Sequence, residues 1–362
     1  FALKHANSKI MRLRSCTFSL ATLIAPNNLK SSLINPKLSM SGVPLVSAPK
    51  TLLVTSETDA ASMVMHDSLI KLGQWTEIST DKTKQKYWGH ANGNVWMTRL
   101  KEPMIMSDNI DSVFVTDIGI YLTDVIFLSK HSAASGQPSL TVHPIGIPVS
   151  DNENKYGGIK GKFPPPNPRL SQFYNALERN IINEAISNEM QITFEVTHHG
   201  PYLDTPAMFC EIGSTESHWG RTDAGELWAK ILSEMLNFES NQKKGFKMWF
   251  EMTETERKGS VVFVNLGGGH YAPKCGDMAK KGAFVGHMLA NYAFDWGEKN
   301  NWKETISEAV ASTRKSFVGG SLCALIDKKS FKSEQRKKIE ETLSELEVPF
   351  SYKKEDLLEN TL

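Results

Sequence analysis

The clearest alternation of apolar and polar positions lies in residues 192–197, which read ITFEVT. Apolar residues at every second position are typical of a strand that is buried on one face. Two adjacent histidines, His198 and His199, follow it, and a Gly-Pro turn then ends the strand. The pattern therefore predicts a strand that delivers two imidazoles to the edge of a sheet, where α/β enzymes keep their reactive groups.

Similar patterns predict the other elements. The expected strands cover residues 51–55, 95–100, 112–118, 124–131, 140–144, 192–197, 209–212, 261–266 and 323–326, and the expected helices cover residues 59–72, 170–187, 222–238, 283–294, 302–315 and 333–346. Residues 79–95 and 150–168 are polar or rich in glycine and proline, so we expect loops there. The alternation of strands and helices predicts an α/β fold with three αβα layers around a mixed, largely parallel sheet.

Charge is distributed unevenly along the 362 residues. The 41 Lys and Arg residues balance the 40 Asp and Glu residues, yet the first acidic residue is Glu57. A basic, serine-containing segment without acids is typical of an organellar transit peptide, so we expect residues 1–49 to be a disordered leader and residues 50–362 to be one catalytic domain. If translation starts at Met40, most of this leader is absent and the protein is cytoplasmic. The remainder is net acidic, which leaves only local contacts with RNA.

Several common classes are excluded by the sequence. No apolar stretch is long enough to cross a membrane. The four cysteines show no paired spacing, which favours a reducing compartment over a disulfide framework. The motifs G-x-G-x-x-G, G-x-x-x-x-G-K-[ST], G-x-S-x-G and H-E-x-x-H are all absent. Any chemistry must therefore come from another constellation of residues.

Histidines recur at the ends of the expected strands, and acids follow a further strand. The histidines are His131, His143, His198, His199 and His270, and the acids are Glu211 and Glu216. Imidazole and carboxylate are suitable zinc ligands, and an acid left over can act as a base. The same groups can also form a metal-free site with a general base and backbone oxyanion donors. A third alternative is a binding protein in which these histidines are structural.

Four segments then carry a resemblance to a known family. They read SKHSAASGQPSLTVHPIG (residues 129–146), EVTHHGP (195–201), EIGSTESHW (211–219) and GGGHYAP (267–273), and in this order they resemble the D-aminoacyl-tRNA deacylases of archaeal and plant type. The resemblance covers about residues 50–345. It implies hydrolysis of the ester that joins a D-amino acid to the terminal adenosine of tRNA, a monomeric phosphorylase/hydrolase-like fold related to peptidyl-tRNA hydrolase, and a zinc requirement. Plant members are also associated with clearing aldehyde-modified D-aminoacyl-tRNA.

This chemistry gives the candidate residues their expected roles. We expect His199, Glu211 and His131 to be catalytic, with His199 taking a proton from water near neutral pH. Zinc is expected on His143, His198 and His270. The expected substrate-binding residues are Gly267, Gly268 and Gly269, whose N–H groups would stabilise an oxyanion, together with Tyr271 and Lys274.

Two further expectations concern the substrate. Lys274, Lys280 and Lys281 form one basic run, and Lys328, Lys329 and Lys332 form a second. We expect at least one of these runs to flank the site and hold the acceptor stem of tRNA by phosphate contacts. L-aminoacyl esters share every functional group with the D form, so rejection must depend on shape. The rival hypothesis is a zinc-dependent amidohydrolase or phosphorylase-like enzyme that acts on a small metabolite.

Overall fold

The computed structural model describes residues 48–149, 156–239, 247–297 and 301–359. Nearly all of the predicted leader, residues 1–49, lies outside these ranges. Residues 48–362 belong to one compact unit.

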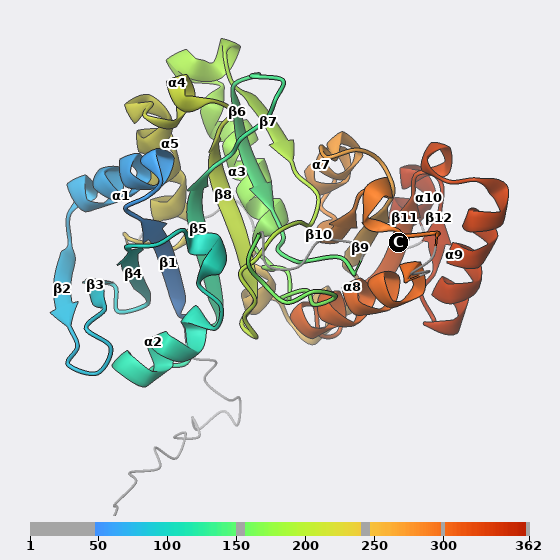
Figure 1. The fold of residues 1–362 in the computed structure, drawn as a ribbon, viewed down its shortest axis with the longest axis horizontal. Helices are drawn as coiled ribbons and strands as arrows, with labels where there is room; N and C mark the ends of the chain where they lie inside the picture. The colour runs from blue at the N-terminus through green and yellow to red at the C-terminus, as the bar shows by residue number, and fades with distance from the viewer. Residues whose placement is uncertain (1–47, 150–155, 240–246, 298–300, 360–362) are drawn as a thin grey trace, which may run out of the picture. The chain divides into compact units, whose positions relative to one another are not determined.

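The strands of the described residues form two sheets (Figure 1). The larger has eight strands in the order β2-β3-β4-β1-β5-β8-β6-β7, and the smaller has four in the order β10-β9-β11-β12. The strands of the larger sheet are β1 (Thr51–Ser56), β2 (Trp75–Ser79), β3 (Lys86–His90), β4 (Val95–Leu100), β5 (Asp124–Lys130), β6 (Ser139–His143), β7 (Gln191–Phe194) and β8 (Ala207–Gly213). Those of the smaller sheet are β9 (Val261–Leu266), β10 (Phe284–Leu289), β11 (Ser321–Ile326) and β12 (Phe350–Ser351).

Most neighbouring strands are parallel. The antiparallel pairs are β2 with β3, β3 with β4, and β6 with β8. The helices are α1 (Ala60–Leu72), α2 (Ile110–Ile118), α3 (Leu170–Ile181), α4 (Glu216–Trp219), α5 (Thr222–Met235), α6 (Glu254–Lys258), α7 (Pro273–Lys280), α8 (Trp302–Ser316), α9 (Ser333–Glu345) and α10 (Lys354–Glu359). Short 3-10 turns lie at Met104–Met106, Ala185–Asn188, Trp249–Glu251, Asn291–Ala293 and Lys328–Ser330.

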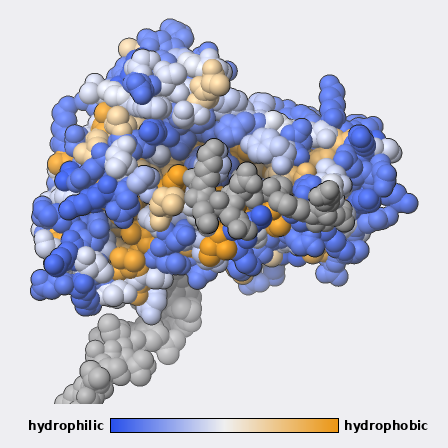
Figure 2. All heavy atoms as spheres, viewed as in Figure 1, coloured by the Kyte–Doolittle hydropathy of each residue, from blue (hydrophilic) through white to orange (hydrophobic). Residues whose placement is uncertain are grey.

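Helices cover both faces of the larger sheet. Successive side chains of a strand point to opposite faces, so Leu53 packs in the core shared with α1, α3 and α5, whereas Val54 packs in the core shared with α2. The predicted α/β class, with its layers and its mixed, largely parallel sheet, is confirmed, although the strands divide between two sheets. Hydrophilic residues cover most of the face drawn in Figure 2, as expected when apolar side chains fill these cores.

Two predicted elements have the opposite type in the structure. Residues 112–118, expected as a strand, belong to helix α2, whose Ile110 and Phe114 lie one turn apart and are both buried. Residues 283–294, expected as a helix, contain the fully buried strand β10. A short apolar run has no periodicity that separates a buried strand from a buried helix, and tertiary packing decided both cases.

Polarity also misled the prediction at the edge of the sheet. Residues 79–95, expected as a loop, include β3, which pairs with β2 in an antiparallel hairpin. β2 is the edge strand and β3 lies next to it, and both are partly exposed, so they have polar side chains where a buried strand has apolar ones. Helix α7 was not expected, and the helix expected at 170–187 ends at Ile181.

Candidate active site

The strand-end histidines converge on one cavity of about 750 Å³. His131, His198, His199 and His270 line it, and the ring centroid of the buried His143 lies 4.2 Å from that of His198. His143 ends β6, and the other four histidines follow β5, β7 and β9. The predicted convergence of the five histidines is therefore confirmed.

Strand register explains why Glu211 lies between two of these histidines. On β8, Glu211 is paired with Ser129 of β5 and with Thr141 of β6. His131 and His143 lie two residues beyond these partners, so alternation directs their side chains to the same face of the sheet. Glu211 Oε2 lies 3.6 Å from His131 Nδ1, and Glu211 Oε1 lies 3.6 Å from His143 Nε2.

A second carboxylate, that of Glu195, is fully buried among the histidines. Its Oε2 lies 3.0 Å from Nδ1 of His131 and 2.8 Å from Nε2 of His270. Its Oε1 has no hydrogen-bond partner in the described part of the chain. The Val196 N–H donates to the His270 carbonyl at 3.0 Å, and this bond holds the segment after β7 beside the loop after β9.

No role was expected for Glu195 from the sequence, although two signals were present. The residue opens the EVTHHGP motif, and it lies on the polar side of the alternation in residues 192–197. Both features place its side chain with those of the strand-end histidines.

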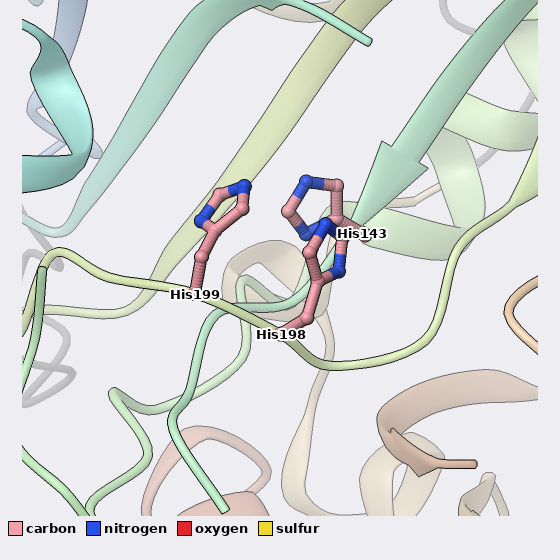
Figure 3. A group of neighbouring side chains, drawn as sticks. All are labelled: His143, His198 and His199. Atoms are coloured by element: carbon pink, nitrogen blue, oxygen red, sulfur yellow. The ribbon is translucent and has the colours of Figure 1, made fainter. Parts of the chain in front are cut away.

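Three histidines share a hydrogen-bonding pattern that determines which ring nitrogen carries hydrogen. Nδ1 donates to the carbonyl of the following residue in His143, at 3.0 Å, and in His199, at 2.6 Å. In His198, Nδ1 donates to the Val196 carbonyl at 2.7 Å. A carbonyl only accepts, so each neutral imidazole has its lone pair on Nε2. Figure 3 shows the three rings side by side, and one ligand atom from each lies within 4.8 Å of the others.

This group has the features of a zinc site. Histidines that bind zinc donate their other N–H to an acceptor such as a backbone carbonyl, as all three do here. Nε2 of His143 is buried and has no hydrogen-bond partner among the described residues. The predicted zinc ligands, by contrast, fall into two groups: His143 and His198 lie with His199, and His270 lies with His131 and Glu195.

Burial and neighbouring charges shift the pKa values of these histidines in opposite directions. Burial disfavours the charged form of His131, but its hydrogen bonds to Glu195 and Glu211 outweigh burial and raise the pKa to about 11. Burial, together with repulsion from neighbouring imidazoles, lowers the pKa of His199 to about 4 and that of His198 well below its usual value. At neutral pH a cationic His131 therefore balances the buried carboxylates, while His198 and His199 keep a free lone pair.

The glycine turn after β9 has fewer free amides than predicted. The Gly267 N–H donates to the Leu289 carbonyl at 2.7 Å, and the Gly268 N–H donates to Ser330 Oγ at 2.7 Å. These amides are already used, so the prediction that they bind an oxyanion is wrong. Gly269 remains the candidate donor of the three.

Of the other predicted substrate-binding residues, Tyr271 lies at the site and Lys274 does not. Tyr271 Oη lies 2.8 Å from Nε2 of His131. Lys274 Nζ lies 2.6 Å from Asp327 Oδ1, and no residue of the run with Lys280 and Lys281 is among the described residues that line the cavity. The lysines of the second run, Lys328, Lys329 and Lys332, are not among these lining residues either, so the contact of a basic run with the acceptor stem stays a prediction.

Close packing explains the glycines in the described part of the predicted 150–168 loop. The Gly200 N–H donates to the Tyr156 carbonyl at 2.8 Å, and a Cβ on Gly200 would lie 2.3 Å from the Gly158 nitrogen. A Cβ on Gly157, which has a φ of +63°, would lie 1.7 Å from the Ile105 carbonyl oxygen. The glycines thus allow this loop to form the cavity wall next to the histidine turn.

The family model and the curated relatives agree on one family. Residues 119–351 match the family model described as D-aminoacyl-tRNA deacylase. A D-aminoacyl-tRNA deacylase of Arabidopsis thaliana is 34% identical over 311 residues, which cover 82% of this chain and 96% of that protein. A D-aminoacyl-tRNA deacylase of Aeropyrum pernix is 32% identical over 231 residues, 63% of this chain and 75% of that protein. The crystal structure of AF0625, described as a conserved protein of unknown function, aligns with a TM-score of 0.68 and 26% identity over 86% of this chain and 98% of that chain.

Proposed function

The chain belongs to the D-aminoacyl-tRNA deacylase family, so it hydrolyses the ester between a D-amino acid and tRNA, and we propose that this reaction takes place in the histidine-lined cavity. The observation that carries the proposal is the convergence of five histidines and two buried carboxylates on one cavity. An aminoacyl ester is already activated, so its hydrolysis needs an oriented water, a base and an oxyanion donor. The cavity contains candidate groups that could orient the water, act as the base and stabilise the oxyanion.

Zinc is the proposed cofactor, and His143, His198 and His199 are its proposed ligands. This set replaces the expected His270 with His199, because His143, His198 and His199 each offer one ligand atom within 4.8 Å of the others and each Nδ1 is bonded to a carbonyl. A catalytic zinc ion with three protein ligands supplies a water of low pKa and polarises the ester carbonyl.

His270 is the residue proposed to move protons. Its Nε2–H donates to Glu195, and its Nδ1 lies 3.0 Å from the hydroxyl of Tyr292, which lines the cavity. Nδ1 is therefore the atom that accepts a proton from the attacking water, and the buried carboxylate orients the ring and stabilises the imidazolium. The same atom returns the proton to the ribose oxygen when the ester bond breaks.

The other predicted catalytic residues support this arrangement by their charge. His131 lies beside both Glu195 and Glu211, and its hydrogen bond to Glu195 helps to keep the pKa of that carboxylate low. His199, expected as the base, has the same Nε2 lone pair as the two other proposed ligands. Its grouping with them favours the ligand role over the role of base.

Selectivity is proposed to come from the walls of the cavity. The apolar residues Met104, Ile105 and Pro148 line it together with the histidines. A wall that accepts a D side chain can exclude the L enantiomer by a steric clash. Aldehyde-modified D-aminoacyl-tRNA differs at the amino group alone, so we propose it as a further substrate.

A mixed substrate tests the function. The protein should release D-Tyr but not L-Tyr from a tRNA pool charged with both. Release of both amino acids, or of neither, would contradict the proposal. A zinc-dependent amidohydrolase or phosphorylase-like enzyme for a small metabolite is the alternative, and the family membership does not favour it.

The setting proposed for this reaction is the cytoplasm, with the protein as a monomer. Cys210, Cys275 and Cys323 are buried free thiols, which supports a reducing compartment. No helix in the described ranges is long and apolar enough to span a bilayer. The RNA contact would be confined to the acceptor end of the substrate.

A further inference from the structure

Lys130 adds a positive charge to the cavity lining besides that of His131, whose ring lies beside the carboxylates of Glu195 and Glu211. It ends β5, its side chain is exposed, and it is the one Lys or Arg among the described lining residues. The carboxylates of Asp59, Glu195 and Glu211 line the same cavity. An anionic group of a ligand would be repelled by these carboxylates unless it lies close to the Lys130 ammonium.

The structure holds this ammonium in a defined place. Lys130 Nζ lies 4.4 Å from the ring centroid of Trp219, within the range of a cation–π interaction. The Trp219 Nε1–H donates to the His131 carbonyl at 2.8 Å, and the Lys130 N–H donates to Asp59 Oδ2 at 2.9 Å. The indole and the backbone thus fix the ammonium beside the catalytic histidines, and no carboxylate of the described residues lies within 4.0 Å of it.

Hydroxyl groups lie on the same part of the cavity. Thr58 follows β1 and Ser132 follows β5, and both side chains are exposed and line the cavity with Lys130. β1 and β5 are parallel neighbours, so their carboxyl ends lie side by side, where α/β folds bind ligands. An ammonium with nearby hydroxyl donors is suited to a phosphate group.

We propose that Lys130, assisted by Thr58 and Ser132, binds the phosphodiester on the 5′ side of the terminal adenosine of aminoacyl-tRNA. This inference rests on the proposed function, because the ester in the cavity is attached to the ribose of that adenosine. The phosphodiester is attached to the same ribose, so an ester held near His270 brings an anion to the edge of the cavity. Lys130 is then a substrate-binding residue that was not expected from the sequence.

A substrate without the phosphate tests this assignment. Lys130→Met keeps the aliphatic stem on Trp219 and removes the charge. Its kcat/KM for D-Tyr-tRNA should fall about tenfold, the effect of losing one charge-assisted hydrogen bond, whereas its kcat/KM for 3′-O-(D-tyrosyl)adenosine should equal that of the wild type. Lys130→Arg should retain most activity on both substrates. The slope of log KM against log salt for tRNA should decrease by about 0.7 in Lys130→Met, as for one lost phosphate contact on a single strand.

Lys280→Ala is the matched control. Lys280 is also an exposed lysine near an aromatic ring, 5.7 Å from the centroid of Tyr174, but it does not line the cavity. Its substitution should change neither substrate's kcat/KM. An equal loss on both substrates in Lys130→Met, or no loss on either, would overturn the proposal. Failure of the proposed function gives a different result, because His270→Ala would then remain active on both substrates.

Discussion

Oε2 of Glu195 lies 2.8 Å from Nε2 of His270, although the two residues are 75 positions apart in the chain and follow strands of different sheets. The carboxylate is fully buried, and its pKa is well below the usual range: burial opposes this shift, but hydrogen bonds from His131 and His270 outweigh it. A buried anion of this kind orients an imidazole and favours its protonated form. The pair therefore connects the two sheets at the point where we place proton transfer.

Glu195→Gln keeps the shape of this side chain and removes its charge. We expect activity on D-Tyr-tRNA to fall about 10- to 100-fold, as is usual when the partner of a catalytic or ligating histidine is lost. The pKa of His131, now raised to about 11 with help from Glu195, should also fall, and an NMR titration of the metal-free protein would measure it. Glu226→Gln, which removes an exposed partner of Lys71, should change neither quantity. Full activity in a folded Glu195→Gln protein would show that the charge of Glu195 has no role in the reaction.

The variants His199→Ala and His270→Ala distinguish the proposed zinc ligand, His199, from the residue proposed to transfer protons, His270. Both variants should lose deacylation, but only His199→Ala should lose bound zinc, because His270 is not in the proposed ligand group. Elemental analysis and the rate of D-Tyr release measure the two properties. His218→Ala, which alters a histidine outside the cavity lining, should change neither. If His199→Ala binds zinc normally and is inactive, His199 is the base, as the sequence analysis expected.

The fold could be predicted where each segment has one dominant pattern. Strands β1, β5 and β9 are apolar runs bounded by turn residues, and helices α5, α8 and α9 have apolar residues at helical spacing. Residues 283–294 have no alternation of buried and exposed positions that would reveal a strand, since all six residues of β10 are buried. The division into two sheets depends on contacts between distant segments, such as the hydrogen bond from the Thr197 N–H to the Met288 carbonyl, and no local pattern encodes them.

The sequence predicts which residues form the site, but it does not predict which of them lie next to one another. Strand ends identified all five histidines and Glu211, because the carboxyl ends of neighbouring strands meet at one edge of a sheet. Which histidine accompanies which carboxylate depends on distances of a few ångströms, and these follow from register and loop packing. The sequence also gives no sign that Lys274 is paired with Asp327, or that Lys130 lies against Trp219.

Leu232→Ala tests the core independently of the site. Leu232 is fully buried on α5, and its truncation should lower the free energy of unfolding by roughly 2–5 kcal/mol, which urea denaturation measures. Leu72→Ala, at a residue that is 49% exposed, should cost far less. The folded fraction of Leu232→Ala should keep the specific activity of the wild type. A lower specific activity in that fraction would show that the core and the cavity are coupled.

Removal of zinc is the most direct test of the proposed cofactor. Three imidazoles that each offer a ligand atom within 4.8 Å of the others, and that each donate Nδ1–H to a carbonyl, are an arrangement that a metal ion would stabilise. Protein treated with a chelator, shown to be metal-free by elemental analysis and folded by circular dichroism, should lose D-aminoacyl-tRNA hydrolysis and regain it with added zinc. Zinc binding should also raise the melting temperature, because an ion that binds only the folded state stabilises it. In His143→Ala, added zinc should produce neither effect, which separates this site from adventitious binding elsewhere. Full activity in the metal-free protein would contradict the zinc proposal. Catalysis would then depend on the Glu195–His270 pair and His199.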